Sequence, residues 1–117
     1  MKLIKIPAFT EEYKIIAVLG PRKDLVKFLI KEGWTREAAT KLWANPSSGK
    51  AFNYLPNPLL MVDTDLPYQI IVATLAHEAL HCANFIGDFI GVDDKAGEFK
   101  CHIVSAVLRH CIPKIKK

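Results

Sequence analysis

The segment from residue 68 to residue 86 constrains the fold more than any other, because it is apolar on nearly every helical face but has three strongly polar residues at its centre. These residues are His77, Glu78 and His81, and the other ionisable groups of the segment are a thiol and a phenol. A helix that is apolar all round is expected to be largely buried. Burial of a carboxylate without a partner is costly. The three polar side chains therefore predict a shared partner, and a divalent cation would serve all of them.

The order of these residues, H-E-x-x-H, has the spacing of a zinc site. Residues four apart on a helix have Cβ atoms about 5–6 Å apart, so the imidazoles of His77 and His81 can both reach a zinc ion at about 2.0–2.1 Å. Glu78 would then hold or deprotonate a metal-bound water, which predicts a zinc hydrolase. The competing interpretation is a pair of core histidines that are hydrogen-bonded to the backbone or to Glu78.

A catalytic zinc has three protein ligands and one open position, and Glu98 is the predicted third ligand. It follows His81 by seventeen residues, after a glycine-bearing loop and near the start of a predicted helix. Its alternative role is that of an acidic residue favoured by the helix dipole, and Asp93, Asp94 and His102 compete as ligands. His102 lies four residues after Glu98 on the same face, where it could orient a zinc-bound histidine or substrate, or simply be exposed.

The pattern of apolar residues predicts a small α+β protein with one domain, residues 1–117. A short mixed or antiparallel sheet is expected to pack on the motif helix and on a C-terminal helix. Thr35 is a predicted N-cap, one residue of the turn 63–65 is another, and Pro113 is expected to end the last helix. The predicted strands are 3–6, 13–19, 51–55 and 59–62, and the predicted helices are 21–31, 35–43, 67–86 and 95–111.

Composition narrows the class of protein. The net charge is +4, but the basic residues are scattered rather than clustered with aromatic ones, so nucleic acid is not an expected partner. The chain has three cysteines, an odd number, and no C-x-x-C pair; they are Cys82, Cys101 and Cys111. We therefore expect reduced, buried thiols rather than disulfides or a thiolate zinc knuckle. No secretion signal is recognisable, and the apolar run at 70–76 is short of the ~20 residues that span a bilayer. These features predict a soluble, cytoplasmic protein without a membrane partner.

The residues TLAHEALH at 74–81, followed by Glu98 on the next helix, resemble the core of gluzincin-type metallopeptidases. They are similar to the very small H-E-x-x-H domains that bacteriophages and prophages encode. The resemblance covers residues 53–112 and implies a zincin-like fold, a Zn²⁺ cofactor and a peptide or protein substrate. It also implies that the strand at 59–63 forms the edge of the cleft and pairs with extended substrate. In larger gluzincins an acidic residue occupies the position of His102.

In the hydrolase interpretation Glu78 is the general base, and His102, Tyr54 or Tyr68 supplies a donor to the oxyanion, with nothing in the sequence to select among them. Two other functions remain open. The chain could bind zinc without catalysis and act by binding a host protein, with Cys101 or His102 as a fourth ligand. It could also be a metal-free helical interaction domain with buried histidines. The sequence indicates neither the substrate nor the oligomeric state.

Overall fold

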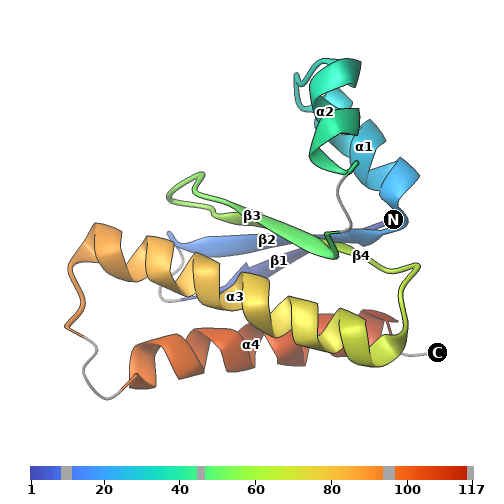
Figure 1. Cartoon of the computed structure of the whole chain (residues 1–117). Coiled ribbons are helices and arrows are strands. Elements are labelled where there is room, and N and C mark those ends of the chain that lie inside the picture. The colour runs from blue at the N-terminus through green and yellow to red at the C-terminus, as the bar shows by residue number, and fades with distance from the viewer. Residues whose placement is uncertain (9–11, 45–46, 94–96, 116–117) are drawn as a thin grey trace.

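The chain forms a four-stranded sheet with helices on both faces (Figure 1). This computed structural model describes residues 1–8, 12–44, 47–93 and 97–115. In chain order the elements are β1 (Lys2–Pro7), β2 (Lys14–Gly20), α1 (Arg22–Lys31), α2 (Arg36–Leu42), β3 (Gly49–Phe52), β4 (Leu59–Asp63), α3 (Tyr68–Ile90) and α4 (Glu98–Ile115).

The sheet is mixed, with the strand order β1-β2-β4-β3. β1 and β2 are antiparallel, β2 and β4 are parallel, and β3 and β4 are antiparallel. The predicted α+β class and mixed sheet are therefore confirmed. The predicted cleft-edge strand is not, because β4 lies between β2 and β3 and every one of its residues is buried. In this sheet β3 is the edge strand on the side of the motif helix.

Side chains alternate between two cores, as expected for strands with both faces covered. Ala17 and Leu60 point into a core beneath α3 and α4, whereas Val18 and Met61 point into a second core beneath α1 and α2. In the first core α3 packs against β3 and β4, and α4 packs against α3, β1 and β2. Figure 1 shows the two long helices side by side under one face of the sheet.

The helix ends agree with the prediction in some places and differ in others. The hydroxyl of Thr35 accepts a hydrogen bond from the backbone N–H of Ala38 at 3.1 Å, which confirms the predicted N-cap. The N-cap of α3 is Pro67, without a side-chain hydrogen bond, so the predicted cap within 63–65 is wrong. Pro113 lies inside α4 rather than ending it, because near a helix end its missing N–H removes only one hydrogen bond.

The motif helix is longer than predicted, since it runs through Gly87 to Ile90. Its C-cap is Gly91, whose φ of 73° lies in the left-handed region that glycine adopts freely. Continued packing against the next helix explains the extension: a Cβ on Gly87 would lie 3.4 Å from the ring of Phe99. Gly87 is thus a close-packed position of the interface between α3 and α4.

A partly buried ion pair fixes the turn that leads from β4 into α3. The carboxylate of Asp63 is 3% exposed and accepts a hydrogen bond from Nε of Arg22 at 2.8 Å. The other carboxylate oxygen accepts from the backbone N–H of Asp65 at 2.9 Å. Arg22 also donates to the carbonyl oxygens of Trp43 and Ser47. One guanidinium therefore connects α1, the end of α2, the start of β3 and the end of β4.

Among the described residues, α3 is the one helix that is long and apolar enough to cross a membrane, with a mean hydropathy of 1.3 over its best window. Half of that window is buried inside the protein, and core helices of soluble proteins pass the same test. The helix as a whole therefore has spanning length, although its apolar run at 70–76 is short. By itself this feature is weak evidence for a membrane role.

Candidate metal centre

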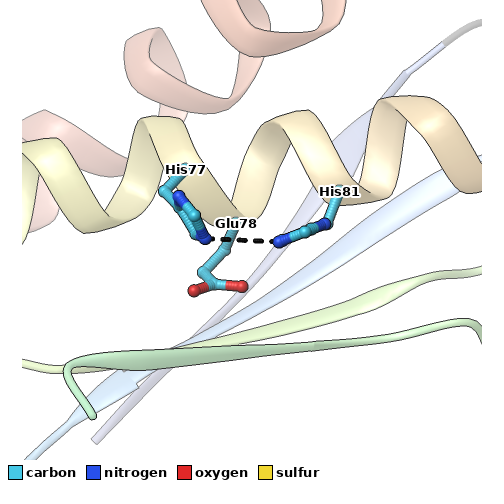
Figure 2. Close-up of side chains that lie close together, drawn as sticks. All are labelled: His77, Glu78 and His81. Carbon is cyan, nitrogen blue, oxygen red and sulfur yellow. Dashed lines mark hydrogen bonds between the residues drawn. The ribbon is translucent and has the colours of Figure 1, made fainter.

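The two imidazoles of the motif approach each other closely on one side of α3 (Figure 2). Nε2 of His77 and Nε2 of His81 are 3.2 Å apart, and their rings are inclined at 80°. With Zn–N distances of about 2.05 Å, nitrogen atoms at this separation subtend an angle of about 100° at the ion, which is close to tetrahedral. The ligand atoms of His77, Glu78 and His81 all lie within 4.8 Å of one another. The pair therefore suits one shared proton or one shared metal ion.

Burial differs sharply within this cluster. Glu78 is 6% exposed, whereas His77 and His81 are both exposed. The expectation of a largely buried helix is wrong, because α3 buries the sides that face the sheet and α4 and leaves its outer side uncovered. Ile70 and Leu80 are also exposed on this helix, at 46% and 45%. The cost of burying a group without a partner therefore applies to the carboxylate of Glu78 alone. The histidines are accessible to an incoming ion or ligand.

Desolvation makes Glu78 a stronger base than an exposed glutamate. Burial raises the pKa of its carboxyl group above 4.5, and the nearby imidazoles of His77 and His81, followed by Lys50, partly oppose this rise. A raised pKa brings a carboxylate closer to the range in which a general base works at neutral pH. A cation at the histidines would favour the ionised form, as nearby positive charge does in general.

The edge strand β3 begins directly against Glu78. A Cβ built on Gly49 would lie 2.5 Å from Cγ2 of Thr74 and 3.0 Å from Cγ of Glu78, so only glycine fits here. The hydroxyl of Thr74 donates to the hydroxyl of Ser48 at 2.7 Å. The predicted strand at 51–55 begins two residues after Gly49, so the prediction does not include this contact. A glycine at the start of an apolar strand was the available signal, since it often marks a close backbone approach.

The structure does not bring Glu98 into the cluster. Glu98 is the exposed first residue of α4, and its neighbour Phe99 packs on Gly87. Gly87 lies six residues past His81, which corresponds to about 9 Å along a helix axis. In the view of Figure 2, α4 also runs on the other side of α3 from the imidazoles. A ligand role for Glu98 stays a prediction that these positions do not support.

The other candidate ligands do not join the cluster. His102 and Asp93 are exposed, and neither belongs to the metal-ligand cluster found among the described residues. Tyr54 and Tyr68, the candidate donors to the oxyanion, are also exposed. Asp94 falls outside the described residues.

The cysteines are free, as predicted, but not all are buried. Cys82 and Cys111 are buried and Cys101 is exposed, so the expected burial is wrong for Cys101. Burial raises the pKa of Cys82 to about 12, with a further contribution from the charge of Glu78, and burial raises that of Cys111 to about 12. These two thiols are protonated at neutral pH and are poor metal ligands in this state.

No protein-family model matches this chain, and no similar curated protein or solved structure was found. The resemblance to gluzincins therefore remains a hypothesis that rests on the motif. The arguments for function come from the local chemistry of His77, Glu78 and His81.

Proposed function

We propose that this chain is a zinc-dependent hydrolase, specifically a metallopeptidase, in which His77 and His81 bind Zn²⁺ and Glu78 is the general base. The observation that carries the proposal is the 3.2 Å separation of two exposed imidazole nitrogens beside a buried carboxylate. Two core histidines would be expected to have separate partners in the interior. Exposure of both rings, with their nitrogens converging, favours a shared ion.

Each residue has a distinct task in this proposal. When bound, zinc would supply Lewis-acid chemistry that lowers the pKa of a water to about 7. Glu78 would accept a proton from the water that attacks the peptide carbonyl, and its raised pKa suits that task. His77 and His81 hold the ion at the surface, where substrate can reach it. Glu98 and His102 would join the site only through a change in the position of α4, so we assign them no step.

The edge strand supports a peptide as the substrate. β3 ends the sheet beside the motif helix, and Figure 2 shows it running below the two imidazoles. The outer edge of a sheet presents unpaired backbone groups that can pair with an extended peptide. A peptide bound along β3 would pass next to His77 and Glu78. This proposal assigns to β3 the pairing with substrate that the resemblance to gluzincins implies for the strand at 59–63.

The test compares zinc content with hydrolysis of a peptide mixture. Glu78→Gln should retain zinc and lose hydrolysis, because the amide keeps the shape but cannot accept the proton. His77→Ala should lose both. His110→Ala is the matched control, since this exposed histidine binds the carbonyl oxygen of Ala106 within α4. Full activity in Glu78→Gln would exclude the mechanism, and absence of zinc from the wild type would exclude the metal site.

One observation favours a second function, a zinc-binding protein without catalysis that acts by binding a host protein. The described group that could hold a metal is His77, Glu78 and His81; with Glu78 serving as the base, two protein ligands are left, fewer than the three of ordinary catalytic zinc. A zinc-loaded Glu78→Gln variant that binds its target as the wild type does would support this function. For either function we propose a cytoplasmic location, which the free thiols support.

A further inference from the structure

The metal centre of a single chain is incomplete. His77 and His81 provide two nitrogen ligands, and Glu78 is buried between α3 and β3. No other histidine, cysteine, aspartate or glutamate among the described residues joins this group. Zinc in proteins is almost always four-coordinate, with at least three ligands from protein. With Glu78 serving as the base, as proposed above, two positions on the ion are open to groups from outside the chain.

The histidines stand within an apolar surface that is also uncovered. Ile70, Ala73, His77, Leu80 and His81 are exposed on α3, and we name them the outward face. Ile70, Ala73, His77 and Leu80 follow one another at intervals of three and four residues, the spacing of a stripe that packs against another helix. The metal ligands are therefore part of a surface suited to helix packing.

The outward face carries no formal charge. Between residues 68 and 87 the one charged side chain is Glu78, which is buried, and the next one along this side of α3 is the exposed Asp88, seven residues past His81. Two copies of this face can thus meet without juxtaposing like charges. Related by a two-fold axis, they would present the same patch to each other, as in most symmetric dimers. An axis near His77 and His81 would place four imidazoles around one point.

We propose that zinc links two copies of this chain through the outward face, with His77 and His81 of each copy binding a single ion on the two-fold axis. The inference rests on the zinc-binding half of the proposed function. In this dimer the second pair of imidazoles occupies the positions that water and substrate need. The dimer is therefore a form of the protein in which hydrolysis is blocked.

Sedimentation velocity of the full chain, with and without half an equivalent of zinc per chain, tests this arrangement. The mass should double from 13.1 kDa on addition of zinc and return on chelation. Elemental analysis of the dimer should give one zinc per two chains. His77→Ala and His81→Ala should abolish the doubling, and His102→Ala, which changes an exposed histidine of α4, should not.

The apolar part of the outward face has its own matched pair of variants. Leu80→Glu should abolish the dimer while zinc still binds, because it places a charge in the interface. Leu3→Glu changes a leucine of the same exposure on β1 and should leave the dimer intact. Two results would contradict the zinc-linked dimer but not zinc binding by the chain. One is zinc bound one-to-one to a monomer, and the other is a dimer that persists in His77→Ala. Absence of zinc binding would overturn both.

Discussion

Gly49 offers a test of whether β3 is held against the motif helix as the structure shows. In Gly49→Ala the new methyl group would lie 2.5 Å from Cγ2 of Thr74, 2.9 Å from the carbonyl oxygen of Met61 and 3.0 Å from Cγ of Glu78. Carbon atoms pack best at about 3.5–4.0 Å, so the strand or the helix must move by several tenths of an ångström or more. Overpacking of this kind costs about 1–3 kcal/mol.

The expected change in melting temperature follows from the size of the protein. An unfolding entropy of about 2.1 cal/mol/K per residue gives about 0.25 kcal/mol/K for this chain. A loss of about 2 kcal/mol therefore lowers Tm by about 8 °C. Thermal unfolding followed by circular dichroism measures this shift. Gly87→Ala is the control, because its methyl group would meet Phe99 at an ordinary 3.4 Å and would also favour the helix.

A second substitution shows whether the cost comes from the predicted contact. Thr74→Ser removes Cγ2 and keeps the hydroxyl that binds Ser48. Gly49→Ala combined with Thr74→Ser should therefore recover part of the lost stability, with a coupling energy of about 1 kcal/mol. The contacts with Met61 and Glu78 account for the remainder. A Gly49→Ala protein as stable as the wild type, or a double variant with strictly additive losses, would refute the packing of β3 on α3.

Three further results are expected. Glu98→Gln should change the affinity for zinc by no more than about twofold, measured by competition with a chelator. A loss of about 1.4 kcal/mol in binding free energy, which is a tenfold weaker affinity, would show that Glu98 is a ligand. The metal-free protein should lose stability as the pH rises above 4.5, because the raised pKa of Glu78 means that the folded state binds more protons than the unfolded state in that range. Glu78→Gln should flatten this part of the profile in urea titrations, and an unchanged profile would contradict it. Arg22→Met should cost about 1–3 kcal/mol, because the buried carboxylate of Asp63 loses its hydrogen bond from Nε of Arg22, a side chain that is itself 35% exposed, and unchanged stability would argue against the ion pair.

The sequence predicts much of the secondary structure because local patterns determine it. Short apolar segments predicted β1 and β2, and the N-cap Thr35 predicted the start of α2. The end of α3 was missed because Gly87 breaks helices in isolation. Here its small size allows the ring of Phe99 to pack closely, and this contact is a tertiary interaction.

The sequence predicts the cluster of His77, Glu78 and His81 better than it predicts which elements surround this cluster. The i, i+4 spacing fixed the approach of His77 and His81, since one helix carries both. The positions of Glu98 and β4 depend on how α4 packs and on strand order, which sequence separation does not encode. Apolar composition alone predicts a buried helix. In the structure a four-stranded sheet and one neighbouring helix cover only part of α3 and leave its outer side exposed.

X-ray absorption spectroscopy of the zinc-loaded protein tests the central claim most directly. The account predicts nitrogen ligands at about 2.0–2.1 Å with the outer-shell scattering of imidazole, and loss of that signal in His77→Ala. A sulfur shell at about 2.3 Å would place the metal at a cysteine instead. That result, or an unchanged spectrum in His77→Ala, would contradict a zinc centre at His77 and His81.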